Sequence, residues 1–348
     1  LMIKGLSMFS NVGIAETYLK DCGIDMILAN ELIENRANFY KEIHYSDVII
    51  GDINKKEVFN EIIKKSKSLN INFILATPPC QGMSKAGKMS EQDPRNTLII
   101  KAMNVFEELL PDAMLIENVP EMFKTFILID GERINIKDYL ENICEKLNYN
   151  VDFDIFDAAD YGTPQFRKRS FTRIYKQKYV WNNPIKQKPI TVHDAIGNLP
   201  SLESGEKSNI PYHEAKKHNE NHILWMKNTP TGKSAFENII HYPKKDGRKI
   251  RGFKTTYKRI SWDRPAPTIT MANGSVSSQS NVHPGKELKD GTYSDARVLT
   301  LLEIFKLTGL PDNWSPPKWA SENMIRHVIG EAIPPKLIKA IVEQLKEK

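Results

Sequence analysis

Short apolar runs alternate with helical segments along the first 180 residues of the chain. The apolar runs are residues 26–29, 48–50, 73–76 and 113–116. Between them, stretches such as 55–67 and 97–110 carry apolar residues at helical spacing. Continuous apolar strands that alternate with helices are typical of a parallel sheet covered by helices on both faces. The pattern therefore predicts an α/β fold with a doubly wound, mostly parallel sheet.

Acidic or reactive residues follow the predicted strands. Glu31, Asp52 and Glu117 come at or just after three of the runs, and Cys80 follows the fourth. In open α/β sheets, ligands bind in the crevice at the carboxyl ends of the strands. We therefore expect these four side chains to line one common crevice.

The pattern changes after the fourth run. Alternating residues at 152–156 and around Phe171 and Ile174 predict antiparallel or edge strands that complete the sheet. From Trp181 to about residue 294, Pro, Gly, Asn and Lys become frequent and the alternation of strand and helix disappears. This composition indicates a smaller, irregular, partly β domain.

Helical patterns return near the end of the chain, first at residues 297–308. After Pro334-Pro335, one helix face carries Leu337, Ile338, Ile341 and Leu345. We therefore expect residues 2–185 and 297–348 to form one domain and residues 186–296 to form the smaller one.

Composition places the chain among ordinary globular proteins, with 40% hydrophobic and 26% charged residues. No apolar run approaches the roughly 20 residues that a membrane helix needs, and the first residues lack the apolar stretch of a signal peptide. The cysteines Cys22, Cys80 and Cys144 have no metal-ligand spacing. We expect a cytoplasmic protein without disulfides, a membrane segment or a bound metal.

Positive charge is concentrated in one segment. Residues 203–262 hold 13 Lys and Arg against 6 Asp and Glu, whereas the whole chain has a net charge of +6. Aromatic and histidine residues, such as Trp225, His241 and Tyr257, are interleaved with these cations. The combination is typical of a surface that binds a polyanion such as a nucleic acid. Charge alone fits a solvated lysine-rich face equally well.

Cys80 stands on a stiff loop directly after an apolar run. Pro78 and Pro79 precede it, and each proline fixes φ at about −65° and removes an N–H donor. Such a backbone holds a thiol in place, as a nucleophile requires. A lone cysteine is nevertheless more often a buried structural residue, so the neighbouring motifs must decide between the two interpretations.

Several features near the N-terminus favour a nucleotide-like ligand. Residues 8–16, with the single glycine Gly13, form a predicted turn whose backbone N–H groups could face a cofactor. Glu31 fits the acidic residue that receives ribose hydroxyls in nucleotide-binding folds, and Asp52 could accept from an adenine amine. Each acid alone is more often a solvated strand end. As a series they favour an adenosine-containing cofactor.

Three further motifs lie downstream. Glu117 ends the strand predicted beside Cys80, and a carboxyl group in a closed pocket has a raised pKa and can donate a proton. Arg167 and Arg169 alternate, so on an extended segment both would point to one face. Phosphate contact or surface charge explains this pair as well. Residues 330–335 open the last helix, which also fits an ordinary proline-led helix start.

In this order, the segments resemble the DNA (cytosine-5)-methyltransferase family of bacterial restriction–modification systems. The matching blocks are Pro78-Pro79-Cys80-Gln81, Glu117-Asn118-Val119, Gln165-Phe166-Arg167-Lys168-Arg169 and Gly330 with Pro334-Pro335. Residues 93–98 and 297–312 resemble further blocks, and residues 264–269 resemble the Thr-Ile element of the family's target-recognition domain. The resemblance covers nearly the whole chain except about residues 205–255.

The chain departs from the family pattern at three positions. Members usually open with Phe-x-Gly-x-Gly-Gly, whereas Asn11 and Ile14 replace two of these glycines here. The last block usually carries Asn where this chain has Glu331. Both blocks contact the cofactor in the family, so the departures bear on cofactor affinity and leave the expected fold unchanged.

The resemblance implies a Rossmann-like, S-adenosylmethionine-dependent methyltransferase fold, with residues 186–296 as the target-recognition domain. It also implies that a methyl group passes from S-adenosylmethionine to carbon 5 of a flipped-out cytosine in a specific double-stranded DNA sequence. The reaction would run through a covalent adduct of Cys80 at carbon 6. A nearby arginine would lower the pKa of the thiol, and Glu117 would hydrogen-bond N3 and the exocyclic amine of the base.

The residues that the resemblance assigns fall into three groups. The catalytic residues are Cys80, Glu117, Arg167 and Arg169. The cofactor-binding residues are Phe9, Asn11, Gly13, Glu31, Asp52, Ile53, Pro79, Leu98 and Glu331. The DNA-binding residues are Gln81, Ser84, Arg95, Gln165 and Thr268. No metal is implied.

Two other functions compete with this interpretation. Relatives of the family methylate tRNA with the same catalytic blocks, although the long stretch between Gln165 and Arg297 leaves room for a DNA-recognition domain. A catalytically silent DNA-binding module is the second alternative, and the intact Cys80, Glu117, Arg167 and Arg169 argue against it. Besides double-stranded DNA, the resemblance suggests a cognate restriction endonuclease that acts separately. One monomer suffices for the mechanism, so we expect a monomer; the target sequence stays open.

Overall fold

The computed structural model describes residues 2–79 and 97–348. Within this part of the chain, the backbone divides into two compact units. The first, which we call the sheet unit, contains the described residues up to Asp157 together with Lys168–Ile185 and Ile338–Lys348. The second unit contains Ala158–Arg167 and Lys186–Leu337. Residues 297–337 therefore pack with the second unit, whereas the functional division into a catalytic and a target-recognition domain stays a prediction.

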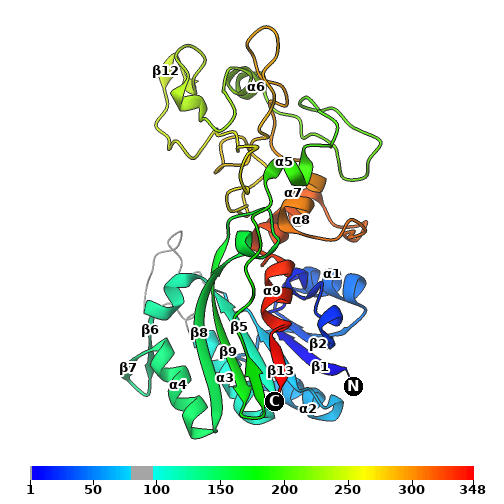
Figure 1. Cartoon of the computed structure of the whole chain (residues 1–348), viewed down its shortest axis with the longest axis vertical. Coiled ribbons are helices and arrows are strands. Elements are labelled where there is room, and N and C mark those ends of the chain that lie inside the picture. Colours follow the sequence, from blue (N-terminus) through cyan, green and yellow to red (C-terminus); the bar gives the residue numbers. More distant parts are fainter. Residues whose placement is uncertain (1, 80–96) are drawn as a thin grey trace. The chain divides into compact units, whose positions relative to one another are not determined.

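Seven strands of the described chain form the main sheet of the sheet unit, in the order β3-β2-β1-β4-β5-β9-β8 (Figure 1). The strands are β1 (Ile3–Met8), β2 (Ile24–Glu31), β3 (Asp47–Ile50), β4 (Phe73–Ala76), β5 (Ala113–Asn118), β8 (Tyr149–Asp157) and β9 (Lys168–Lys176). The first five in the order are parallel, and β9 runs antiparallel to both of its neighbours. The strand order reverses between β1 and β4, which is where open α/β sheets form their ligand crevice.

Helices cover both faces of this sheet. α2 (Lys56–Leu69), α3 (Leu98–Leu109) and α4 (Ile136–Lys146) share one core with the strands, through residues such as Ile62, Phe106 and Leu140. Ile74 of β4 belongs to the same core. Its neighbour Phe73 points to the opposite face, where its ring centroid lies 6.5 Å from that of Trp181.

The opposite face is covered from the C-terminus and by α1. Trp181, in β10 (Tyr179–Trp181), donates its ring N–H to the carbonyl of Ile341 in α9 (Pro335–Val342) at 2.7 Å. Strand β13 (Leu345–Glu347) pairs with β10. A separate cluster that includes Ala29, Ala37, Tyr40 and Val48 holds α1 (Glu34–His44) against β2 and β3. The predicted doubly wound α/β fold is confirmed.

Smaller elements complete the sheet unit and its connections. β6 (Phe126–Ile129) and β7 (Glu132–Asn135) form an antiparallel hairpin. The short 3₁₀ helices are η1 (Ile14–Glu16), η2 (Lys20–Cys22), η4 (Pro120–Lys124), η5 (Ala158–Tyr161) and η6 (Ala235–Glu237), of which the last two belong to the second unit. No helix in the described ranges 2–79 and 97–348 is long and apolar enough to cross a membrane.

The second unit consists mostly of loops, as the composition of residues 181–294 predicted. Its helices are α5 (Val192–Ile196), α6 (Glu220–Lys227), α7 (Leu301–Thr308) and α8 (Glu322–Glu331), and its paired strands are β11 (Lys244–Lys245) and β12 (Arg248–Lys249). A small core that includes Trp225, Met226, Tyr257, Val282 and Val298 lies among them. Because few backbone groups lie in helices or sheets, side chains must satisfy many of the buried carbonyls.

Two sequence predictions about helix limits were wrong. Leu345 does not continue the last helix, because α9 ends at Val342 and Leu345 pairs with Trp181 in the β10–β13 sheet. The helix expected from residue 297 begins only at Leu301. Thr300 caps it by accepting a hydrogen bond from the backbone N–H of Glu303, so the preceding residues are free to enter other contacts.

Candidate functional site

The loop that follows β1, which we call the cofactor loop, comprises residues 9–13. Phe9, Asn11 and Gly13 adopt left-handed backbone conformations, with φ of 56°, 50° and 78°. Asparagine tolerates this region better than most side chains do, so Asn11 can replace the glycine usual in the family. Ile14 is buried in η1 and needs no glycine. The local geometry thus accommodates two of the departures from the family pattern.

Gly13 cannot be replaced in the same way. A Cβ at this position would overlap the side chains of Tyr40 and His44 in α1, and its φ is one that only glycine adopts readily. The cofactor loop therefore packs directly against α1. The single glycine of this motif is the one that the structure requires.

Glu31 links the cofactor loop to the end of β2. Its carboxylate accepts hydrogen bonds from the backbone N–H of Asn11 at 2.8 Å and of Ile33 at 2.9 Å. The side chain is buried, with 6% of the residue exposed. Each carboxylate oxygen has two lone pairs, so Glu31 can still accept from further hydroxyl groups. These acceptor oxygens suit the hydroxyl groups of the ribose in an adenosine-containing ligand.

The neighbouring strand ends carry the other cofactor-binding candidates. Asp52 follows β3 and accepts a hydrogen bond from the N–H of Asn54, while Ile53 is buried in the core. Pro79 is exposed after β4, and Leu98 begins α3 against the same core. The hydroxyl of Thr77, also after β4, donates to the carbonyl of Phe9 at 2.9 Å. The ends of β1 and β4 are thereby joined.

Glu117 and Arg169 form an ion pair in the sheet unit. Glu117 lies in β5 and Arg169 in β9, with Nε of the arginine 3.1 Å from Oε1 of the carboxylate. The glutamate side chain is only 7% exposed. The pair fixes the orientation of the carboxylate at the end of β5.

Asn118 connects the same strand end to the proline loop. Its Nδ2 donates to the carbonyl of Pro78 at 3.2 Å, and its Oδ1 accepts from the N–H of Val119 at 2.8 Å. Ser170 of β9 donates to the carbonyl of Val119. The last described residues before Cys80 are thus attached to the strand that carries Glu117. Four predicted site residues, Cys80, Gln81, Ser84 and Arg95, lie outside the described residues.

Arg167 and Arg169 do not act as one pair. Strand β9 begins at Lys168, so only Arg169 belongs to it. Arg167 is 3% exposed and donates to the carbonyls of Ile269 and Gly330 at 2.8 and 2.9 Å within the second unit. The expectation that the two side chains share one face fails because the extended segment is shorter than the motif.

Gln165 is also committed to internal contacts. It is buried, its Nε2 donates to the carbonyl of Leu307, and its Oε1 accepts from the N–H of Ile269. Thr268, by contrast, is exposed, and its hydroxyl donates a hydrogen bond to the carbonyl of Phe166 at 2.7 Å. Gln165 and Arg167 therefore hold the backbone of a segment that presents Thr268 to solvent.

Glu331 lies at the end of α8 in the second unit, where its carboxylate is 3.4 Å from Nε2 of His327.

The sequence motifs did not identify Tyr40 and His44, which contact the cofactor loop from α1. Their spacing of four residues places them on a common face of α1. No local pattern indicates that this face meets residue 13.

Part of the basic segment of the second unit, residues 244–249, forms a hairpin. Lys244, Lys245, Arg248 and Lys249 are exposed on β11 and β12. The turn residues Asp246 and Gly247 have φ of 50° and 76°, as in the tight turns preferred by two-residue hairpins. Beside the hairpin, Ile239, Ile240 and Phe253 are 92%, 71% and 78% exposed. This is a candidate nucleic-acid interface.

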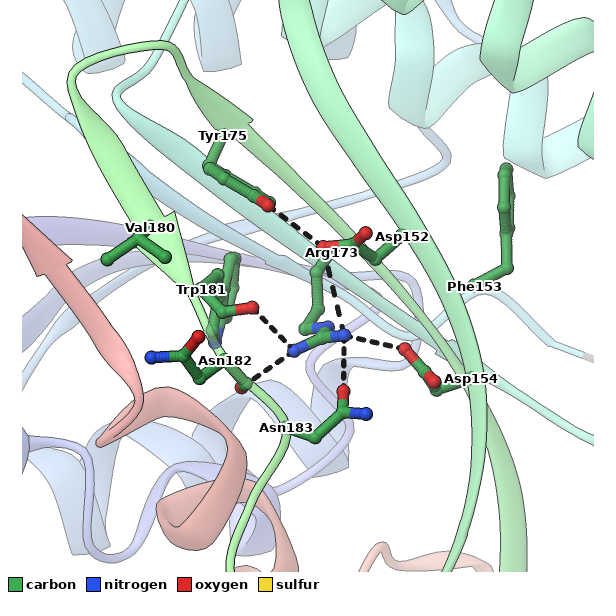
Figure 2. A pocket seen from close by; sticks show the side chains of 9 residues that line it. All are labelled: Asp152, Phe153, Asp154, Arg173, Tyr175, Val180, Trp181, Asn182 and Asn183. Carbon is green, nitrogen blue, oxygen red and sulfur yellow. Dashed lines mark hydrogen bonds and ion pairs between the residues drawn. The ribbon is translucent and has the colours of Figure 1, made fainter.

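A surface groove of about 380 Å³ lies elsewhere on the sheet unit, along β8, β9 and β10 (Figure 2). Arg173 lies at its centre and donates to the carboxylate of Asp154 and the side-chain oxygen of Asn183, both at 2.6 Å. The same guanidinium donates to the carbonyls of Trp181 and Asn182. These bonds attach the β10 segment to the sheet, so the polar residues of the groove have a structural role.

In the part of the chain that the structure describes, no group of three His, Cys, Asp or Glu could hold a metal ion.

Comparisons with known proteins agree with this architecture. Residues 3–347 match the family model of the C-5 cytosine-specific DNA methylases. The chain is 50% identical to Type II methyltransferase M1.HgaI of Avibacterium volantium, over 99% of this chain and 98% of that protein. It is 27% identical to Type II methyltransferase M1.HphI of Haemophilus parahaemolyticus, over 89% of this chain and 81% of that protein.

Solved structures share the fold at lower identity. A crystal structure from E. coli, described as a DNA modification methyltransferase encoded within a prophage, has a TM-score of 0.70 at 20% identity, and 98% of each chain is covered. The methyltransferase EhMeth of Entamoeba histolytica has a TM-score of 0.66 at 16% identity, with 99% of this chain and 98% of that chain covered. These structures show the shared fold, and the family model and the 50% identical relative establish that this chain is an enzyme of the C-5 cytosine-specific DNA methylase family.

Proposed function

We propose that the chain transfers a methyl group from S-adenosylmethionine to carbon 5 of a flipped-out cytosine in a specific double-stranded DNA sequence. The observation that carries the proposal is the junction of β4 and β5. There the ion-paired carboxylate of Glu117 ends one strand, and Asn118 bonds to Pro78 at the end of the other, two residues before Cys80. A nucleophile and a carboxylate on adjacent strand ends suit addition to a polar ring.

The proposed chemistry begins at Cys80, because carbon 5 of cytosine is too weak a nucleophile to take a methyl group unaided. The thiolate forms a bond to carbon 6, and the electron pair of the 5,6 double bond moves to carbon 5. After carbon 5 has taken the methyl group, for which S-adenosylmethionine would leave as S-adenosylhomocysteine, a general base removes the proton from carbon 5. The carbon–sulfur bond then breaks, the double bond returns, and the thiolate is released.

Glu117 orients and polarises the base in this scheme. As a carboxylate it accepts hydrogen bonds, which suits the exocyclic amine of cytosine. In its protonated form it would also donate to N3 and stabilise the charge that builds on the ring during addition. Arg169 holds the carboxyl group in place. We propose that Arg167 supports the site through its bonds to the backbone at Ile269 and Gly330.

Members of methyltransferase families use S-adenosylmethionine in general, and when bound it would supply an electrophilic methyl group. Glu31 would accept hydrogen bonds from the ribose hydroxyls of the cofactor, since the carboxylate retains lone pairs beyond its two hydrogen bonds from the backbone. Asp52 would accept from the adenine amine. The remaining proposed contacts are Phe9, Asn11, Gly13, Ile53, Pro79, Leu98 and Glu331. No metal takes part in this scheme.

DNA would contact residues from several segments. A cytosine inside a duplex cannot reach a pocket thiol, so it must be flipped out at a cost of a few kcal/mol. Gln81, Ser84 and Arg95 are proposed to hold the extruded nucleotide. Thr268 is exposed, and Gln165 would act through the backbone that it holds around Ile269. The exposed cations of the β11–β12 hairpin would contribute phosphate contacts.

The proposal extends to organisation and partners. Residues 2–185 and 297–348 would form the catalytic domain and residues 186–296 the target-recognition domain. The enzyme would act as a monomer in the cytoplasm. The similarity to two Type II methyltransferases supports a restriction–modification role, with a separate endonuclease that cleaves the unmethylated sequence.

Covalent trapping tests the nucleophile. The parent protein should form a stable adduct with duplex DNA that contains 5-fluorocytosine, because fluorine at carbon 5 blocks the final elimination. Cys80→Ala should form none, while Cys22→Ala should trap as the parent does. Equal trapping by Cys80→Ala and the parent would show that another residue is the nucleophile.

Substrate class needs its own assay. Labelled methyl groups should appear on duplex DNA, and bisulfite sequencing of DNA from cells that express the protein should identify the modified sequence. Label on tRNA with none on DNA would support the RNA alternative and overturn the proposal. No adduct and no label on either nucleic acid would favour the silent DNA-binding module.

A further inference from the structure

One continuous segment, Glu31–His44, holds the cofactor loop at its middle residue and at its last residue. We propose that His44 and Tyr40 of α1 are positioning residues that keep residues 9–13 in the conformation that binds the methyl donor. The inference rests on the proposed function, because it assigns these residues to the methyl-donor site. Neither side chain belongs to the family blocks on which the assignment of the site was based.

His44 acts on the Gly13 end of the loop. Its Nε2 lies 2.9 Å from the carbonyl oxygen of Gly13, which also accepts the backbone N–H of Glu16 at 3.1 Å. Burial lowers the pKa of His44 to about 4, so the ring is neutral at pH 7. Because a carbonyl can only accept, the proton of the neutral ring must lie on Nε2.

Tyr40 acts one turn earlier along α1. Its hydroxyl donates to the carboxyl group of Glu16, which is buried in η1 directly after the cofactor loop. The Tyr40 and His44 rings pack together with their centroids 4.6 Å apart. A Cβ at Gly13 would overlap both side chains, so the two rings fill the space beside the loop. They hold Gly13, the last residue of the loop, and Glu16, the last residue of η1, together.

The middle of the loop is held by the start of the same segment. Glu31 accepts from the N–H of Asn11, and its second oxygen accepts from the N–H of Ile33 just before α1. Left-handed backbone at a bulky residue such as Phe9 costs free energy and persists only when the surroundings determine it. The β2–α1 segment supplies these surroundings, so its hydrogen bonds should set the affinity for the donor.

The test compares His44→Ala, which removes the donor, with His44→Gln, whose amide N–H can reach the same carbonyl. Asn38→Ala, at an exposed position of α1, is the matched control. Binding of S-adenosylhomocysteine to the full chain would be measured by calorimetry, and the KM values for S-adenosylmethionine and for DNA would be measured separately. We expect about tenfold weaker binding and a raised cofactor KM for His44→Ala. His44→Gln should restore most of the affinity, with the DNA KM unchanged in both.

Three results would overturn the inference: unchanged S-adenosylhomocysteine affinity in His44→Ala, failure of His44→Gln to restore it, or an equal loss in Asn38→Ala. If His44→Ala does not fold, Tyr40→Phe removes only the hydroxyl group that holds Glu16. It should then raise the cofactor KM and leave the DNA KM unchanged, and an unchanged cofactor KM would also overturn the inference. A parent protein that binds no S-adenosylhomocysteine would contradict the proposed function instead, so the two failures are distinguishable.

Discussion

Each unit contains a buried cluster of polar side chains, and the two clusters are held in opposite charge states. In the sheet unit, burial raises the pKa of Glu16 to about 7 and lowers the pKa of His44 to about 4. Between these values both groups are mainly neutral, and they hydrogen-bond to Tyr40 and to the carbonyl of Gly13. The cluster below the cofactor loop therefore keeps its position through hydrogen bonds between neutral groups.

The second unit keeps a buried cluster ionised. Arg297 lies 2.9 Å from a carboxylate oxygen of Asp295 and 2.8 Å from one of Glu303, and all three side chains are at most 2% exposed. Burial alone would raise the pKa of Glu303, but the charges of Arg297 and His283 and the hydrogen bonds from Arg297 and the Thr300 N–H together outweigh it, and the pKa falls to about 2. Here the partners must be charged, because each compensates for the burial of the other.

The difference follows from how each unit satisfies its backbone. In the sheet unit, neighbouring strands pair most carbonyls in the sheet. In the second unit, arginines take over this task, since Arg259 donates to the carbonyls of Met226 and His283 and Arg297 donates to that of Leu202. A loop-rich unit that uses guanidinium groups in this way must also bury carboxylates to balance their charge.

The largest expected effect is the loss of the buried cation. Arg297→Met leaves Asp295 and Glu303 without their guanidinium partner, and it should destabilise the second unit by about 3–5 kcal/mol. Lys306→Met is the control, because Lys306 pairs with the exposed Asp312 at 2.9 Å and should cost about 0–1 kcal/mol. Urea denaturation followed by tryptophan fluorescence measures both. Equal losses of unfolding free energy in the two variants would show that the buried and the exposed ion pairs do not differ in their contribution to stability.

The two clusters should respond to pH with opposite slopes. Glu16 has a folded pKa of about 7 against an ordinary value of 4.5, so its stabilising contribution is complete below pH 4.5 and is lost as the pH rises through 7. Glu303 has a lowered pKa, so its contribution is present above pH 4.5 and is lost as the pH falls towards 2.

Glu16→Gln tests the neutral cluster directly. Glutamine cannot ionise, so the variant should lose the alkaline decline of stability that Glu16 causes, a difference of about 1–3 kcal/mol between pH 5 and pH 9. Thermal denaturation across this range measures it, and the acid limb should match that of the parent. A parent and variant with the same alkaline slope would mean that Glu16 does not titrate near pH 7.

The smallest effect is expected at Asn11. Because asparagine adopts the left-handed region at little cost, Asn11→Gly should change stability by only about 0.5 kcal/mol. The affinity for S-adenosylhomocysteine should change by less than about threefold. Calorimetry would show this, with Gly13→Ala as the contrasting variant, since its Cβ would overlap Tyr40 and His44. A large gain in S-adenosylhomocysteine affinity for Asn11→Gly would mean that the departure from the family motif weakens cofactor binding.

Much of the sheet unit followed from sequence alone. The predicted strand at residues 73–76 coincides with β4, and α2 and α3 begin and end within two residues of their predicted limits. These elements are set by local apolar spacing, which a single sequence displays. Leu345 shows the limit of this reasoning, because its apolar side chain fitted the helical spacing but its backbone pairs with Trp181, far away in the chain.

The candidate site divides in the same way. The motifs identified Glu31 and Glu117, and both lie at strand ends as expected. The partners of Arg167 and Gln165 could not be predicted, since Ile269 is more than 100 residues from either one. Tyr40 and His44 escaped notice because their role depends on the packing of α1 against residue 13.

By itself, the sequence determined the alternation of strands and helices, the ordered blocks around Cys80 and hence the family, because each depends on residue types at short spacing. Tertiary structure decided which polar groups meet. It paired Arg169 with Glu117, placed Arg167 on distant carbonyls and set two rings of α1 beneath the cofactor loop. Such contacts join segments whose distance along the chain carries no local signal, and only the packing of the folded chain brings them within hydrogen-bonding distance.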